Sequence, residues 1–174
     1  MVADLTIELS GVERVDEVRE LWLALHHHHL AIVDSVALVE DDELSWRRRR
    51  DLYVERLASG GGFLALARAG DEVVAYALVC LEQGPDDTFA LGDRYAELYS
   101  LSVGPQMRGQ GIGSLLLDFV DRELGSRGVA DLQVAVMIEN SAARRFYERR
   151  GLRAAQVVMY RLGEGRDVRR QPAG

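Results

Sequence analysis

The feature that most constrains this chain is a glycine-rich turn at residues 104–113, which reads Gly-Pro-Gln-Met-Arg-Gly-Gln-Gly-Ile-Gly. It follows a strand-like segment, Leu98 to Val103, and precedes an apolar helical segment, Ser114 to Val120. The first N–H groups of a helix have no intrahelical partner, and the helix dipole adds partial positive charge there. Glycines let the backbone approach a ligand closely. The turn therefore predicts a binding site for a phosphate group.

Two common phosphate-binding motifs fit this turn poorly. A P-loop needs a lysine after its last glycine, whereas all 21 Lys and Arg residues of this chain are arginines. A dinucleotide fingerprint beginning at Gly109 would need its third small residue at Ser114. It would also need an acidic residue at the end of the next strand, but Asp131 stands at the beginning of that strand. The dinucleotide site stays open as the weaker alternative.

A third pattern, Gln/Arg-x-x-Gly-x-Gly/Ala, is matched by Arg108, Gly111 and Gly113. Downstream, residues 140–152 read Asn-Ser-Ala-Ala-Arg-Arg-Phe-Tyr-Glu-Arg-Arg-Gly-Leu. At this spacing the two segments together resemble those of the GNAT superfamily of N-acetyltransferases. The resemblance implies an α/β (α+β) fold, with a mixed, mostly antiparallel central sheet of six to seven strands and about four helices. It also implies a splayed cofactor cleft next to the turn.

Hydrophobic periodicity assigns elements to the rest of the chain. Alternating apolar and polar residues predict strands, and apolar residues at helical spacing predict helices. The expected strands are residues 5–9, 63–68, 73–81, 98–103, 132–137 and 157–162. The expected helices are residues 12–33, a second helix that follows the acidic run 40–43 and ends at 57 or 58, residues 111–127 and residues 141–150. The polar loop at 83–93 is a candidate cover for the active site.

Length and composition indicate one globular domain, residues 1–162, and a disordered tail, residues 163–174. The net charge of −7 argues against nucleic acid as a partner, because phosphate binding needs clustered cations. No apolar run approaches the roughly 20 residues that cross a bilayer, so no membrane contact is predicted and the expected location is the cytoplasm. The single cysteine, Cys80, excludes an internal disulfide and is expected to be a buried thiol.

Four consecutive histidines, His26 to His29, lie in the first helix. Neighbouring side chains on a helix point about 100° apart, so only His26 and His29 could face the same way. No carboxylate stands at helical spacing to complete a ligand set, and no metal site is predicted. We expect His28, Trp46 and Tyr99 to line an acceptor pocket, with packing in the core as the alternative for the two aromatic residues.

The resemblance implies acetyl-CoA as the acyl donor, with its pyrophosphate in the turn and its pantetheine arm along the preceding strand. The residues implied to bind it are Leu101, Ser102, Val103, Arg108, Gly109, Gln110, Gly111, Ile112, Gly113, Ser114, Asn140 and Ala143. By the same resemblance, the N–H group of Val103 would polarise the thioester carbonyl.

Aminolysis of a thioester needs a base for the amine and an acid for the leaving thiolate. Glu97 is the candidate base, because it stands eleven positions before Arg108, as in family members with a glutamate base. Glu82 and the histidine run are the alternatives. Tyr147 is the candidate acid, since a phenol with a pKa near 10 keeps its proton at neutral pH. An ordinary exposed glutamate and a core aromatic are the alternatives for these two residues.

The predicted function is therefore transfer of acetyl from acetyl-CoA to a primary amine. The acceptor, a small molecule or a peptide or protein, stays open, as does the length of the acyl group. Two alternatives remain: a non-catalytic acyl-CoA-binding module of the same fold, and a structural or partner-binding protein. Dimers are common among proteins of the resembled family, so a homodimer is also considered.

Overall fold

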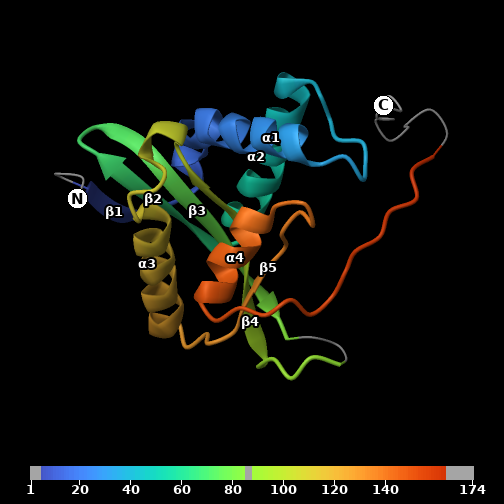
Figure 1. Ribbon diagram of the computed structural model, residues 1–174. Coiled ribbons are helices and arrows are strands. Elements are labelled where there is room, and N and C mark those ends of the chain that lie inside the picture. Colours follow the sequence, from blue (N-terminus) through green and yellow to red (C-terminus); the bar gives the residue numbers. More distant parts are fainter. Residues whose placement is uncertain (1–4, 85–87, 164–174) are drawn as a thin grey trace.

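The computed structural model describes residues 5–84 and 88–163. Its centre is a five-stranded sheet in the order β1-β2-β3-β4-β5 (Figure 1). The strands are β1 (Leu5–Ser10), β2 (Gly62–Ala69), β3 (Glu72–Gln83), β4 (Arg94–Val103) and β5 (Leu132–Val134). The first four strands pair antiparallel with their neighbours, whereas β5 is parallel to β4. The sheet is therefore mixed and mostly antiparallel, as predicted.

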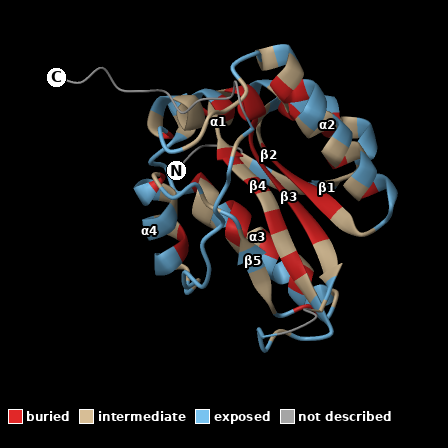
Figure 2. Ribbon diagram, turned by 90° about the vertical axis from the view of Figure 1, so that its right-hand side faces the viewer, coloured by how far each residue is buried: buried red, intermediate tan, exposed pale blue. Residues whose placement is uncertain are grey.

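Helices cover both faces of this sheet, and Figure 2 shows the buried residues on the strands and on the helix sides turned toward them. One layer holds the 3-10 helix η1 (Val12–Val18), α1 (Arg19–Ile32) and α2 (Asp42–Ala58). The other layer holds α3 (Ile112–Ser126) and α4 (Ser141–Arg149), and the short 3-10 helix η2 (Pro105–Met107) precedes α3.

The two faces of the sheet carry side chains of different size. Successive residues of a strand point to opposite faces. Toward α1 and α2 the central strands present large side chains, Leu64, Leu66, Tyr76 and Leu78. Toward α3 they present small ones, Ala65, Ala67, Ala75 and Ala77, which leave room for Leu116, Leu117 and Val120 of α3. The alternation of large and small residues in β2 and β3 thus builds two separate cores.

Three of the predicted elements change their bounds. The strand predicted at 98–103 begins four residues earlier, at Arg94. The first helix, predicted as one stretch from Val12 to Val33, is a 3-10 helix followed by α1. The strand predicted at 132–137 ends at Val134. The second helix, the hairpin of β2 and β3, α3 and α4 lie where the periodicity predicts them, within a residue or two at most ends.

The predicted final strand, residues 157–162, is wrong, and the described residues form five strands rather than six or seven. Val157 and Met159 are 71% and 90% exposed. A strand forms only when a neighbouring strand pairs with its backbone groups. This segment instead runs away from the sheet (Figure 1). Its β-prone composition is therefore not sufficient to make it a strand.

Several other predictions concern residues at the margins of the structure. Residues 164–174, nearly all of the predicted tail at 163–174, lie outside the described residues, as do 85–87 of the polar loop. The limits of the single domain at 1–162 stay a prediction.

In the part of the chain that the structure describes, no helix is both long enough and apolar enough to cross a membrane. Cys80 is buried, as predicted, and burial raises the pKa of its thiol to about 12.

Three buried hydroxyl groups join α2 to the middle of the sheet. The hydroxyl of Tyr53 donates to Ser100 Oγ at 2.5 Å and lies 3.0 Å from the hydroxyl of Tyr76. Ser100 Oγ donates in turn to the carbonyl oxygen of Tyr99 at 2.7 Å. Buried hydroxyls are costly unless they are hydrogen-bonded. This network therefore fixes the position of α2 over β4.

We expect Tyr53→Phe to lower the free energy of unfolding by about 1–3 kcal/mol, because the hydroxyl of Tyr76 loses its partner in the core. Urea denaturation measures this change. Tyr95→Phe is the matched control, since Tyr95 is half-buried in β4, the strand of Ser100, and its hydroxyl bonds to none of the described residues. Equal midpoints for the two variants would contradict the role of the network.

Candidate functional site

Beside the glycine turn, the backbone of β4 loses its partner on one side. The parallel pairing of β4 with β5 ends at Leu98 and Val134. On its other side, β4 stays paired with β3 as far as Val103. The last five residues of β4, 99–103, therefore have a free edge within the described structure. An extended ligand can pair with such an edge as an added strand would.

The register of β4 identifies which backbone groups face this free edge. The amide of Gly104 donates to the carbonyl of Val74 at 2.9 Å. Antiparallel pairs alternate between hydrogen-bonded and non-hydrogen-bonded positions, so Val103 and Leu101 take the non-hydrogen-bonded ones toward β3. Their N–H and C=O groups point to the free edge instead. The backbone groups of Ser102 point toward β3, and its side-chain hydroxyl donates to the carbonyl oxygen of Leu21. The register therefore favours Leu101 and Val103 as the residues that pair with a ligand.

A β-bulge at Tyr99 changes which side chains share a face. Leu78 pairs with Ser100 and Val79 with Leu98, so Tyr99 is the extra residue in β4. Tyr99 and Ser100 consequently both point toward the layer of α1 and α2. Beyond the bulge, the side chains of Leu101 and Val103 pack on the α3 side. Bulges bend a strand and increase its local twist, which fits the loss of pairing between β4 and β5.

The glycine turn presents a row of free amides. The N–H groups of residues 109–113 make no hydrogen bond with the described residues. Gly109 and Gly111 have φ of +76° and +81°, a conformation that L side chains rarely adopt. Gly111 is the N-cap of α3 and has no side-chain cap. The amides therefore converge at the positive end of a helix dipole, which is the arrangement that binds anionic oxygens.

Neighbouring residues hold this turn in place. Arg108 Nε donates to the carbonyl of Val103 at 3.1 Å, and Gln110 Nε2 donates to the carbonyl of Gln106 at 3.2 Å. A Cβ added at Gly113 would lie 3.7 Å from Phe146 and Val103, an ordinary contact distance. Alanine would fit at this position, in agreement with the Gly/Ala choice of the sequence pattern.

Helix α4 brings two of the predicted residues next to the turn. Asn140 is buried and caps the helix, since its Oδ1 accepts from the amide of Ala143 at 3.0 Å. Tyr147 is 8% exposed and lies edge-on to Phe146, and its hydroxyl makes no hydrogen bond with the described residues. Burial raises the pKa of its hydroxyl to about 12. The phenol therefore keeps its proton over the whole physiological range.

Glu97 lies on the opposite face of the sheet from Tyr147, toward α1 and α2. It is half-buried, and its carboxylate makes no hydrogen bond or ion pair with the described residues. Burial, with a smaller contribution from Glu82, raises the pKa of this carboxyl above its usual value, while Arg56 acts in the other direction. Because Glu97 and Tyr147 lie on opposite faces of the sheet, a ligand that contacts both would have to lie between β4 and β5, where the two strands no longer pair.

Three residues surround Glu97: Glu82 and Tyr99, which the sequence analysis named, and Arg56, which it did not. Arg56 of α2 forms an ion pair with Glu82 of β3, with Nη1 and Oε1 3.1 Å apart. The guanidinium carbon of Arg56 also lies 5.2 Å from the centre of the Tyr99 ring. Tyr99 therefore contacts this charged cluster as well as the core. Arg56 was not identified from the sequence, because no spacing in the sequence connects this residue with the sheet.

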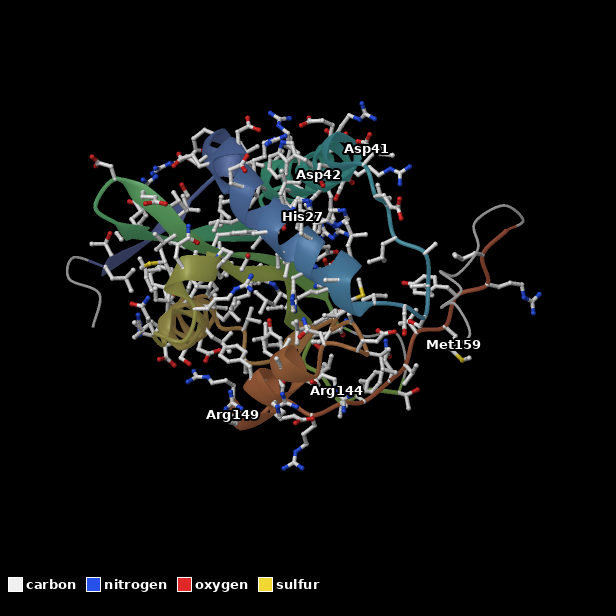
Figure 3. All side chains as sticks on the ribbon, turned by 45° about the horizontal axis from the view of Figure 1, so that its top comes forward. His27, Asp41, Asp42, Arg144, Arg149 and Met159 are labelled. Atoms are coloured by element: carbon white, nitrogen blue, oxygen red, sulfur yellow. The ribbon has the colours of Figure 1, made fainter. Side chains whose placement is uncertain are left out.

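The other predicted pocket residues lie away from this cluster. Trp46 is buried in the core between α2 and the sheet. His28 is half-buried on α1. His27 pairs with Asp42 at 2.8 Å, and Figure 3 shows the two side chains facing each other from α1 and α2. Among the described residues, no group of three or more His, Cys, Asp or Glu could hold a metal ion.

Comparison with known proteins adds to this geometry. A mycothiol acetyltransferase of Kocuria rhizophila is 33% identical over 92 residues, 52% of this chain and 29% of that protein. The ribosomal protein bS18-alanine N-acetyltransferase of Escherichia coli (strain K12) is 39% identical over 62 residues, 36% of this chain and 42% of that protein. The matched part spans less than half the length of either curated relative.

The fold has solved counterparts. A predicted acetyltransferase from Clostridium acetobutylicum, solved with acetyl-CoA, has a TM-score of 0.68 at 14% identity, and the match covers 91% of this chain and 96% of that one. At this identity the likeness concerns the fold alone. The acetyltransferase (GNAT) family model matches residues 16–152. Because this match covers most of its length, the chain belongs to the acetyltransferase (GNAT) family.

Proposed function

We propose that this protein transfers an acetyl group from acetyl-CoA to a primary amine by direct attack. The observation that carries the proposal is the row of free amides at 109–113 beside the unpaired edge of β4. Such a site suits a ligand with a diphosphate followed by an extended amide-containing arm, which describes coenzyme A. A predicted acetyltransferase of the same fold was solved with acetyl-CoA, which supports this choice of donor.

The diphosphate would accept hydrogen bonds from the turn between Arg108 and Ser114. The amide groups of the pantetheine arm would pair with the outward N–H and C=O groups of Leu101, since the carbonyl of Val103 already accepts from Arg108 Nε. Asn140 and Ala143 would contribute by fixing the start of α4, since they bond to each other. The thioester carbonyl would then lie near the N–H of Val103, which would stabilise an oxyanion.

The chemistry requires three proton transfers, two of which would involve side chains of this protein. An alkylammonium with a pKa near 10 is mostly protonated at neutral pH, so Glu97 would take its proton, directly or through one water molecule. The free amine attacks the thioester carbon, the nitrogen of the tetrahedral intermediate loses its second proton to solvent, and the intermediate collapses with cleavage of the C–S bond. Tyr147 donates its proton to the departing thiolate. The products are an N-acetylated amine and the thiol of coenzyme A.

The test of the proposal is the release of CoA thiol in the presence of acetyl-CoA and a panel of primary amines, including short peptides and small polyamines. Turnover with at least one amine is expected. Tight binding of CoA without turnover on any amine would instead support the non-catalytic acyl-CoA-binding module. The names of the two curated relatives point to different acceptors, so the panel includes both small molecules and peptides.

We expect Glu97→Gln to lower kcat/KM at pH 7 by roughly 30- to 100-fold, because the amine must then lose its proton to solvent. The deficit should shrink as pH rises, since a larger share of the amine is already neutral. In the wild type, activity should fall as pH drops through the raised pKa of Glu97, the base being active only when ionised. A variant with the wild-type rate and pH profile would remove Glu97 from the role of base.

A further inference from the structure

Arg56 of α2 contacts residues of β3 and β4 on the face of the sheet that carries Glu97. Its guanidinium forms the ion pair with Glu82 of β3 and lies over the ring of Tyr99 in β4. The side chains of Arg56 and Glu82 are 38% and 23% exposed, so solvent screens this pair only in part. Its Nε is buried and has no hydrogen-bond partner. Leaving a buried donor unpaired is costly, which indicates that the head group is held here by its other contacts.

Two carboxylates lie on this face of the sheet, on neighbouring strands. Glu97 pairs in register with Cys80, and Glu82 with Tyr95, so the two glutamates are diagonal neighbours. Diagonal positions are roughly 7–8 Å apart, close enough for like charges to repel. Glu82 has the cation of Arg56 beside it, whereas Glu97 has no ion-pair partner among the described residues. The two glutamates are thus unequal, because Glu82 has the cation of Arg56 beside it and accepts a long hydrogen bond, 3.5 Å, from the hydroxyl of Tyr99.

We propose that Arg56 is a positioning and specificity-determining residue: it holds Glu82 in an ion pair, leaves Glu97 as the one free carboxylate of the cluster, and thereby selects acceptors with a single positive charge near the reacting nitrogen. This inference rests on the proposed function, in which Glu97 receives the proton of the acceptor amine. Glu82, Glu97 and Arg56 together carry one net negative charge, which matches one ammonium group. A second ammonium nearby would have to compete with Arg56 for Glu82.

A purely structural role for Arg56 predicts something different. If the residue only fastened α2 to β3, its loss would lower stability without changing the titration of Glu97 or the choice of acceptor. The groups that face Glu97 are Glu82 and Cys80 on β3, Tyr99 on β4 and Arg56 on α2. Cys80 and Tyr99 have pKa values raised to about 12, so they stay neutral during a titration between pH 3 and 9. Arg56 and Glu82 are therefore the charges that decide the outcome.

The first test needs no acceptor. The carboxyl carbons of 13C-labelled glutamate are titrated by NMR in the wild type, Arg56→Gln and Arg56→Lys, with Glu97→Gln and Glu82→Gln used to assign the two signals. The pKa of Glu97 should be higher in Arg56→Gln than in the wild type, because a cation that favours ionisation is gone. Arg56→Lys should restore most of the wild-type value. An unchanged Glu97 titration in a folded Arg56→Gln variant would overturn the proposal.

The second test measures specificity. The ratio of kcat/KM for 1,4-diaminobutane to that for butylamine should rise about three- to tenfold in Arg56→Gln, since Glu82 becomes free to bind the second ammonium. The double variant Arg56→Gln/Glu82→Gln should lose this gain. Arg48→Gln is the matched control, because Arg48 lies on the same helix, is exposed and has no ion pair among the described residues. A ratio that stays constant in Arg56→Gln would contradict the selection of acceptors.

The proposed mechanism and the proposed role of Arg56 would be contradicted by different results. If Glu97→Gln keeps full activity, the base is another group and the proposed mechanism fails, whatever Arg56 does. If Glu97→Gln loses activity while Arg56→Gln keeps both the titration and the acceptor ratio of the wild type, only the role of Arg56 is wrong. Should Arg56→Gln fold poorly, Arg56→Met takes its place in both tests, because it removes the charge while keeping an apolar stem that can pack as the arginine stem does.

Discussion

Gly111→Trp should weaken the binding of CoA by more than about a hundredfold, a loss of at least 2.7 kcal/mol. The cause is local to the turn. Gly111 has φ of +81°, and no heavy atom lies within 4 Å of the place where its Cβ would be. An indole there would fill the open space in front of the amides of residues 109–113 and would pull the backbone out of its left-handed conformation. Both effects remove the donors that hold the diphosphate.

The matched control separates this effect from backbone strain. Gly128, at the far end of α3, has φ of +70° and an equally open Cβ position. Gly128→Trp should therefore lower the thermal midpoint about as much as Gly111→Trp does, yet leave the calorimetric affinity for CoA unchanged. Retained affinity in Gly111→Trp would mean that the phosphates bind elsewhere. Equal losses of affinity in both variants would mean that strain, and not the turn, is responsible.

The glycine turn and most elements of the fold could be predicted because their signals are local. Glycines at fixed spacing ahead of an apolar helix describe the anion site directly, and the periods of β2, β3 and α3 are long and regular. The prediction of a final strand was wrong because a strand needs a neighbouring strand to pair with. Val157 and Val158 have strong β propensity, but none of the described segments lies alongside them to complete a ladder.

The geometry of the site could not be predicted, for a different reason. A bulge adds one residue to a strand, and the residue types around Tyr99 do not indicate one. Nothing in the sequence therefore marks Tyr99 as the extra residue in β4. That one residue decides which backbone groups of Leu101 to Val103 face the free edge. The ion pair of Arg56 and Glu82 joins positions 26 apart in the chain. Contacts of this kind follow from packing of α2 on the sheet and not from any local pattern.

Tyr147→Phe should lower kcat by about 10²–10⁴-fold while changing the KM for acetyl-CoA little. The substitution removes only the hydroxyl, and the ring stays in the core against Phe146. With its pKa raised to about 12 by burial, the phenol remains protonated until the thiolate forms. A thiolate that departs from a desolvated site is also more basic than in water, which would make the proton transfer less unfavourable than the two ordinary pKa values suggest. Without this donor, the C–S bond must break to an unprotonated thiolate.

The pH dependence of the rate distinguishes an acid from a packing residue. An acid is active while protonated, so activity that depends on Tyr147 is lost only as pH rises toward about 12. A descending limb below pH 10 therefore belongs to another group and should persist in Tyr147→Phe. Tyr160→Phe is the matched control, since Tyr160 is 70% exposed and loses the same atom without consequence. A Tyr147→Phe enzyme with the wild-type kcat would assign the thiolate proton to solvent, and the buried tyrosine would then be a core aromatic.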